Sequence, residues 1–201
     1  MQATISNINL DESAFAKYQS EYAETNLVLL PDLLKTNALQ TLLKKINDTT
    51  FETKFEGEND DKFGKVLYVP PSKSILSVMT FMLNDEYLFR SLEKITGCKP
   101  IDNFVGRIHR SENTDHGINW HGDNSDNRLL AITLSLGTEY YTGANFEIRK
   151  KGTTDIMRQI SYIKAGDAIV FKIAPELEHR LSLLESGRRT VCVGWFRSKA
   201  E

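Results

Sequence analysis

The residue pattern changes near Ile101, and this change constrains the fold more than any other feature of the sequence. Beyond it, short runs rich in Val, Ile, Phe and Thr are separated by turn signals such as Gly137, Gly143 and Gly152. Many short strands at this spacing favour an antiparallel sandwich or barrel. The expected strands are Phe104–His109, Leu129–Leu136, Ala144–Arg149, Ile160–Ile163, Ala168–Phe171, His179–Leu184 and Arg189–Phe196.

The first half of the chain has a helical pattern instead. Apolar residues recur at helical spacing from Leu34 to Ile46, and Asn26–Leu30 is a short apolar strand before them. Residues Asp48–Gly64 are acidic and polar, and we expect a loop there. The predicted helices begin at Asp11, at Asp32 as a cap, at Ser72 or Ser74, and at Asp85, and the last of them ends at Gly97.

Length and composition fit one globular domain. The chain has 201 residues and no linker or repeat, so we expect one domain over 1–201, with a helical preface of about 1–99 and a β core of about 100–198. The formal net charge is −2. No overall basic field therefore attracts nucleic acid or an anionic membrane, and we expect neither as a partner.

The sequence also predicts the compartment. No apolar run approaches the roughly 18 residues of a membrane span, and Met1–Ser20 does not resemble a signal peptide. Cys98 and Cys192 match no disulfide or metal-site spacing. These features favour a cytoplasmic protein with reduced cysteines. The sequence does not indicate an oligomeric state.

The residues with the clearest chemistry are His121 and Asp123, followed by His179 further along the chain. Residues two apart on an extended segment point to the same face, so His121 and Asp123 can act together. Two imidazoles and one carboxylate form the facial triad of non-haem Fe(II) oxygenases. Taken alone, the His-x-Asp tripeptide is weak evidence and is more typical of a solvated polar turn, which its neighbours Asn124 and Asp126 would also suit.

A charged residue is predicted on an apolar strand face downstream of His179. Alternation places Arg189 on the side of Val191, Val193 and Trp195, with Arg188 opposite. An unpaired guanidinium among apolar residues is costly, so Arg189 needs an anion. A dicarboxylate co-substrate supplies one, and an internal ion pair with Asp or Glu is the alternative.

The C-terminal half resembles the 2-oxoglutarate/Fe(II) oxygenases, and within them the prolyl-hydroxylase-like branch. The resemblance rests on Ile163–Phe171, His179, Gly187-x-Arg189 and Trp195-Phe196, together with His121-x-Asp123. It implies an α+β fold, a double-stranded β-helix (jelly roll) with N-terminal supporting helices. His109 departs from the pattern, because the branch often has a tyrosine there that hydrogen-bonds the co-substrate. Either His109 takes that role or it is a structural histidine. The other departures are Ala144 and Asn145, in a strand that resembles Gly-Gly-Glu-Leu.

The resemblance implies a chemistry as well. His121, Asp123 and His179 would be the catalytic residues and hold Fe(II), while Arg189 and His109 would bind the co-substrate 2-oxoglutarate. With O2, such a site hydroxylates its substrate and releases succinate and CO2. The formal charges of Fe(II), Asp123, 2-oxoglutarate and Arg189 sum to zero, which lowers the cost of burying them together.

The substrate and two rival functions stay open. A peptidyl residue, an amino acid or a small metabolite would each suit the chemistry. A nucleic-acid demethylase of the same chemistry and a non-catalytic jelly-roll binding module are the alternatives. We expect a solvent-facing His116 in a loop and an acidic segment Asp48–Gly64 that is either a lid or a plain solvated connection. The candidate entrance residues are Trp120, Arg128, Tyr140 and Tyr141.

Overall fold

A computed structural model describes residues 6–56, 62–112, 116–124 and 127–200. The helices in this part of the chain are the 3-10 helix η1 (Glu12–Ala14), α1 (Phe15–Thr25), α2 (Thr36–Asn47), α3 (Ser74–Leu83) and α4 (Glu86–Thr96). The strands are β1 (Leu27–Leu30), β2 (Glu52–Glu56), β3 (Lys62–Tyr68), β4 (Asn103–Ser111), β5 (Gly117–His121), β6 (Arg128–Ser135), β7 (Tyr141–Gly143), β8 (Phe146–Lys150), β9 (Ile156–Ile160), β10 (Ala168–Lys172), β11 (Leu177–Leu181), β12 (Leu184–Gly187) and β13 (Arg189–Arg197).

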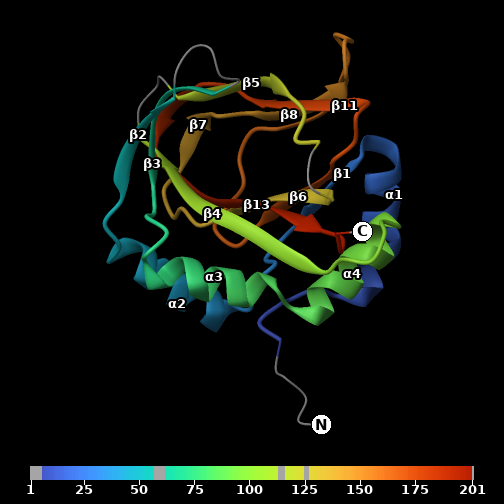
Figure 1. Ribbon diagram of the computed structural model, residues 1–201, viewed down its shortest axis with the longest axis horizontal. Helices are drawn as coiled ribbons and strands as arrows, with labels where there is room; N and C mark the ends of the chain where they lie inside the picture. Colours follow the sequence, from blue (N-terminus) through green and yellow to red (C-terminus); the bar gives the residue numbers. More distant parts are fainter. Residues whose placement is uncertain (1–5, 57–61, 113–115, 125–126, 201) are drawn as a thin grey trace.

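Most strands form one antiparallel sheet that folds into two facing layers, called here the main sheet and the second sheet (Figure 1). Strands β7 and β12 pair separately as a two-stranded sheet. The main sheet has the order β1-β10-β6-β13-β4, and the second sheet has the order β5-β11-β8-β9. Strand β3 pairs with β4 near one end and with β5 near the other, so it connects the two sheets. The fold is therefore sheet-rich and antiparallel, as the sequence predicts.

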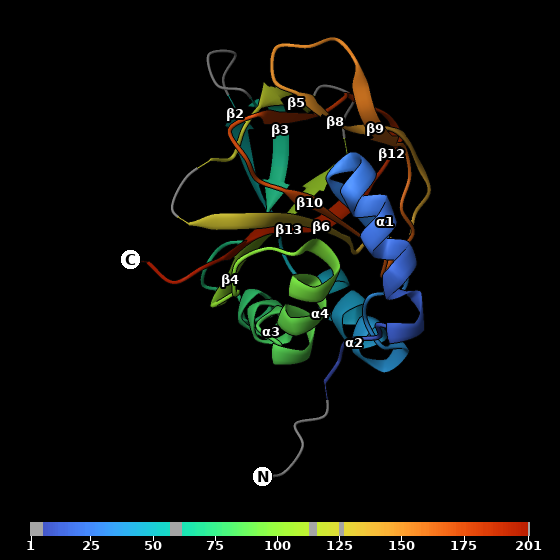
Figure 2. The ribbon, with the colours of Figure 1, turned by 90° about the vertical axis from the view of Figure 1, so that its right-hand side faces the viewer.

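Helices α2, α3 and α4 lie against one face of the main sheet, and the second sheet lies on its other face (Figures 1 and 2). Helix α1 runs along the side of the sandwich next to the edge strand β1. The main sheet is buried on both faces, which explains the nearly continuous apolar runs of β1, β6 and β10. Alternate residues of these strands enter two separate cores. Val28 and Leu30 pack with the helices, whereas Leu27 and Phe171 belong to the core between the sheets.

The predicted helix ends are confirmed at α4 and wrong at α2. Asp85 accepts a hydrogen bond from the Leu88 N–H, and Gly97 ends α4 in the left-handed conformation. Asp32 does not cap α2, which begins at Thr36. Asp32 instead has a φ of 46° in a turn and pairs with Lys164. The apolar residues directly after it lie between that turn and α2, where Leu34 forms a bridge with Ile8.

The segment Asp48–Gly64 is not a loop in its described part. Residues 52–56 form β2, and β3 begins at residue 62; residues 57–61 lie outside the described residues. The pairing of Thr53 with Leu67 and of Lys54 with Val66 makes this a hairpin. Strand β2 is exposed to solvent and carries charged residues, whereas β3 is half-buried and includes the buried Val66. The exposed strand therefore lacks the apolar signal of a strand.

Three strand predictions need correction in the C-terminal half. Strand β9 ends at Ile160, where the predicted strand begins. The expected strand His179–Leu184 is two strands, β11 and β12. Alternation along one strand would place Leu183 on the face of His179, but Leu183 lies between the two strands and is exposed. Strand β5 falls in a segment expected to be a loop. Its Gly117-Ile118-Asn119 stretch is a short, weak strand signal.

The helix layer gives a first testable expectation. The Leu42 side chain on α2 is fully buried in the core between the helices and the main sheet. Leu42→Ala should lower the free energy of unfolding by about 2–5 kcal/mol, because it removes apolar contact and leaves a cavity. Leu183→Ala, at an exposed position, should change it by less than about 0.5 kcal/mol. Urea unfolding measures both, and equal effects would contradict this packing.

The cysteines and the helices can be compared with what the sequence predicts of them. Cys98 and Cys192 are both free thiols, and Cys192 is fully buried. Burial raises the pKa of the Cys192 thiol to about 12, so it stays protonated near neutral pH. None of the helices within the described ranges is long and apolar enough to cross a membrane.

Candidate metal centre

Two of the predicted ligands are brought together by strand pairing in the second sheet. His179 on β11 lies directly opposite His121 on β5 in the antiparallel register. Directly opposed residues place their side chains next to each other on one face. The two imidazole centroids are 4.2 Å apart. Two histidines 58 positions apart in the chain are therefore neighbours in the fold.

Asp123 completes the cluster two residues after His121. One carboxylate oxygen lies 3.9 Å from His121 Nε2, and the other lies 3.6 Å from His179 Nε2. The candidate ligand atoms of the three residues all lie within 4.8 Å of one another. This spacing fits one ion bound between them, and two imidazoles with one carboxylate suit a divalent transition metal.

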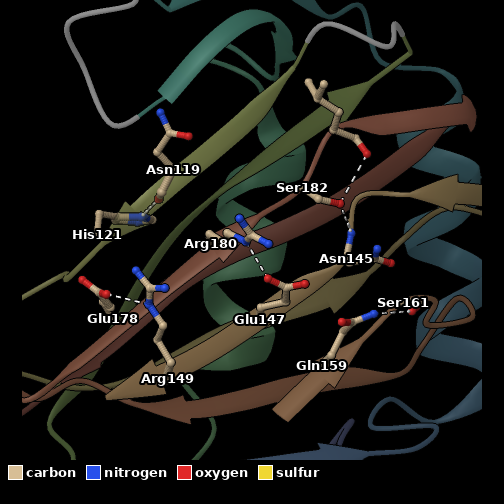
Figure 3. Close-up of polar contacts among 11 residues, drawn as sticks. Asn119, His121, Asn145, Glu147, Arg149, Gln159, Ser161, Glu178, Arg180 and Ser182 are labelled. Atoms are coloured by element: carbon tan, nitrogen blue, oxygen red, sulfur yellow. Dashed lines mark hydrogen bonds and ion pairs between the residues drawn. The ribbon is translucent and has the colours of Figure 1, made fainter. Parts of the chain in front are cut away.

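The ligand orientation is set by hydrogen bonds to neighbouring groups. The His121 Nδ1–H donates to the Asn119 carbonyl oxygen at 2.8 Å (Figure 3), which leaves the Nε2 lone pair directed toward Asp123. Trp195 on β13 donates its indole N–H to Asp123 Oδ2 at 2.9 Å. This bond crosses from the main sheet to the candidate metal centre. Such outer partners typically fix the geometry of metal ligands.

Ion pairs brace the outer face of the second sheet behind this cluster. Arg149 pairs with Glu178, and Arg180 pairs with Glu147 (Figure 3). Both guanidinium groups also lie over the Trp120 ring, at 3.7 and 4.8 Å from its centroid. Because β5, β8 and β11 are tied together in this way, the backbone that carries His121 and His179 is held in register.

A cavity between the two sheets contains the cluster. Its walls combine apolar side chains of both sheets with a few polar groups, as is typical of small-molecule sites. The lining residues are Arg107, His109, Ser111, His116, Ile118, His121, Asp123, Ala131, Ile132, Thr133, Phe146, Phe171, His179, Arg180, Leu181, Arg189, Val191, Val193, Gly194 and Trp195.

Arg189 lines this cavity together with Val191 and Val193, as the strand alternation predicts. It is buried, and its Nε has no hydrogen-bond partner among the described residues. Arg188 points elsewhere and pairs with Glu112 and Glu139. Arg188 thus has carboxylate partners outside the cavity. Arg189 has no ion pair among the described residues, so the alternative of an internal ion pair at Arg189 is not found there. A buried guanidinium with unused donors suits an incoming carboxylate.

The other two histidines also line the cavity. His109 on β4 faces it, opposite Val191 in the register of β4 and β13. His116 is buried, and its Nδ1 lies 3.0 Å from the Ser111 hydroxyl, so the expectation of a solvent-facing loop residue is wrong. Ser111 is itself directly opposite Arg189. Strict alternation back from His121 would place His116 on the opposite face of β5. The register of β5 against β11 is irregular, and His116 and His121 both line the cavity, so strand alternation could not have predicted this position.

The four candidate entrance residues are not among those that line the cavity. Trp120 lies on the outer face of the second sheet, and Arg128 donates to the Asp123 carbonyl oxygen at 3.2 Å. Tyr141 is buried and Tyr140 is exposed beside Tyr162. Trp120 and Arg128 are near the His-x-Asp segment in the chain, and Tyr140 and Tyr141 are near β7. These positions in the chain do not bring the four side chains to the cavity.

The Trp195 hydrogen bond gives a second expectation. Trp195→Phe keeps an aromatic ring but removes the N–H donor to Asp123, and we expect metal affinity to fall by about 10-fold or more. Trp120→Phe is the matched control, because Trp120 has no recorded contact with a cluster side chain, and it should leave metal affinity unchanged. Anaerobic calorimetric titration with Fe(II) measures both variants. Equal affinities of Trp195→Phe and the unmodified protein would show that this donor does not support the site.

Comparisons with known proteins support the same fold. No protein-family model and no curated protein matches the sequence. Among solved structures, a 2OG-Fe(II) oxygenase family oxidoreductase from Burkholderia pseudomallei matches with a TM-score of 0.70 at 16% identity, covering 97% of this chain and 96% of that chain. A Pseudomonas putida prolyl-4-hydroxylase matches with a TM-score of 0.65 at 14% identity, covering 92% and 100%.

A third match differs in its reaction. The non-haem α-ketoglutarate-dependent epimerase SnoN from nogalamycin biosynthesis has a TM-score of 0.66 at 12% identity, covering 94% of this chain and 84% of that chain. All three matches extend over nearly the whole chain, helices included. The antiparallel sandwich with its helical layer is therefore the fold of the 2-oxoglutarate/Fe(II) oxygenases, with prolyl hydroxylases among its structural neighbours.

Proposed function

We propose that this protein is an Fe(II)- and 2-oxoglutarate-dependent dioxygenase that hydroxylates a peptidyl residue, an amino acid or a small metabolite. One observation carries the proposal: His121, Asp123 and His179 converge in a cavity that also contains the buried, unpaired Nε of Arg189. A triad alone would suit several metal enzymes. The Arg189 guanidinium in the same cavity adds the requirement for a co-substrate that carries a carboxylate.

Each residue has a defined task in this proposal. His121 and His179 would bind Fe(II) through Nε2, and Asp123 would bind it through a carboxylate oxygen. Bound Fe(II) and 2-oxoglutarate would supply oxygen activation, with release of succinate and CO2. Arg189 would hold the far carboxylate of the co-substrate as a planar fork. His109 would donate or accept a hydrogen bond along the co-substrate from the neighbouring strand.

The surroundings of the triad suit this chemistry. Phe171 and Phe146 lie against the His179 ring, with centroids 4.6 and 5.7 Å away. These rings limit water at the ligand, and a drier site strengthens each electrostatic contact. Asp123 supplies a third protein ligand, so no position is reserved for a halide. That favours hydroxylation over halogenation.

The same proposal covers the architecture. We infer that the two sheets form a double-stranded β-helix, with α2, α3 and α4 as supporting helices. Strands β1, β2 and β3 come from the first hundred residues, so the preface supplies strands as well as helices. One domain over 1–201 therefore describes the chain better than two separable parts.

The proposal is tested by ordered addition. Anaerobic titration should detect Fe(II) binding first and 2-oxoglutarate binding second, each saturating at one equivalent per chain. Candidate substrates and O2 are then added, and mass spectrometry should detect a product heavier by one oxygen atom. A binding module without catalysis would take up ligands but form no iron-dependent succinate. Absence of 2-oxoglutarate binding at saturating Fe(II) would rule the proposal out.

A further inference from the structure

A second arginine of the cavity, Arg107, has no task in the proposed function. It lies on β4, where alternation places Arg107, His109 and Ser111 on the cavity face. In the register with β13, Ser111 is opposite Arg189, whereas Arg107 is opposite Val193. Four residues along a strand correspond to roughly 13 Å. The two arginines therefore extend from well-separated positions on the same wall (Figure 1 shows β4 beside β13).

Arg107 lies toward the metal end of this wall. Its guanidinium carbon is 5.4 Å from the centroid of the Trp195 ring, and Trp195 donates to the Asp123 carboxylate. A co-substrate that reaches from the triad to Arg189 would extend along the wall away from Arg107. Arg107 is thus close to the reacting centre while remaining outside the span assigned to 2-oxoglutarate.

Arg107 also lacks the partners that its neighbouring arginines have. Arg180 pairs with Glu147, and Arg128 donates to the Asp123 carbonyl oxygen. The Arg107 Nε is inaccessible to solvent and has no hydrogen-bond partner within the described ranges. Its recorded contact there is the face of Trp195. An aromatic face attracts a cation but leaves the guanidinium N–H donors unused.

The charge of the loaded cavity points to what Arg107 binds. The formal charges of Fe(II), Asp123, 2-oxoglutarate and Arg189 sum to zero, and Arg128 lies 3.7 Å from the Asp123 carboxylate as a further cation. Arg107 therefore adds a positive charge that has no ion-pair partner among the described residues. Arg107 is half-buried, and its inaccessible Nε has no hydrogen-bond partner among the described residues. Removing a cation from water without a partner is costly, and a carboxylate matches the guanidinium fork. Building on the proposed function, we propose that Arg107 binds a carboxylate of the primary substrate. The substrate class is then a small carboxylic acid, such as a free amino acid, rather than a neutral peptidyl residue.

The test compares acids with their neutral counterparts. The anaerobic protein, saturated with Fe(II) and 2-oxoglutarate, is titrated by calorimetry with the free L-amino acids and with their carboxamides. We expect at least one acid to bind, and its carboxamide to bind at least about tenfold more weakly. Arg107→Met should weaken binding of that acid by a similar factor. Arg107→Lys should retain part of it, since the charge remains while the fork is lost.

Two controls separate this inference from the proposed function. Arg107→Met should leave 2-oxoglutarate affinity unchanged, and Arg90→Met, an exposed arginine on α4, should leave both affinities unchanged. Equal binding of acid and carboxamide, no acid binding by the unmodified protein, or an unaltered acid affinity in Arg107→Met would each overturn the inference. So would a loss of 2-oxoglutarate affinity in Arg107→Met, since Arg107 would then belong to the co-substrate site. Failure of the proposed function itself appears earlier, as absent 2-oxoglutarate binding by the unmodified protein.

Discussion

His179→Ala should abolish iron-dependent succinate formation and leave the protein folded. His179 lies at the centre of β11 and supplies one of the three donor atoms of the cluster. Water cannot replace an imidazole there without loss of affinity and geometry, because the protein no longer fixes that position. The backbone pairing of β11 with β5 and β8 does not depend on the side chain. Succinate assays and far-ultraviolet circular dichroism measure the two outcomes.

His116→Ala is the matched control for this experiment. His116 lines the same cavity and is likewise buried, but it is not part of the three-residue cluster. The His116→Ala variant should retain Fe(II) binding, whereas His179→Ala should lose it, and anaerobic titration measures both. Wild-type succinate formation by His179→Ala would place the metal site elsewhere in the protein.

Arg189→Ala should weaken 2-oxoglutarate binding by at least about tenfold. Hydrogen bonds to a charged group contribute about 1.5–3 kcal/mol each, and the guanidinium offers two to a carboxylate. Arg189 is buried with its Nε unpartnered in the described part of the chain, so its loss removes a binding group without breaking a recorded ion pair. Calorimetric titration of 2-oxoglutarate at saturating Fe(II) measures the effect.

Arg188→Ala provides the comparison from the adjacent position. Its guanidinium pairs with Glu139 and Glu112 outside the cavity, so 2-oxoglutarate affinity should change little. Loss of affinity in Arg188→Ala with retention in Arg189→Ala would mean that Arg188 is the co-substrate residue. If neither change matters, the assignment of 2-oxoglutarate fails while a metal site could remain.

Strand alternation predicted which side chains share a face where strands are long and buried. Strand β13 runs for nine residues between β4 and β6, so its two faces have different environments and Arg189 could be separated from Arg188. His121, Asp123 and His179 were found because their chemistry is restrictive and the resemblance gave their order. Their spacing in the chain alone would not have shown that His121 and His179 are directly paired.

The parts that could not be predicted depend on tertiary contacts or on solvated strands. The β2–β3 hairpin has little apolar alternation, so its acidic residues indicated a loop. Asp32 precedes an apolar run, yet the turn and its Lys164 partner take it out of the helix. The contact between Trp195 on the main sheet and Asp123, which follows the end of β5, joins residues 72 positions apart. No local pattern encodes that contact, and the same holds for the position of Arg107 beside Trp195.

The most direct test of the account is a single-turnover experiment with the unmodified protein. Fe(II) and 2-oxoglutarate are bound without oxygen, O2 is added, and succinate is counted against protein. The account predicts that succinate forms only when Fe(II), 2-oxoglutarate and O2 are all present, that the amount formed in one turnover approaches one equivalent, and that His179→Ala forms none. Succinate formation independent of Fe(II), or tight binding of both ligands with no succinate after O2, would contradict it.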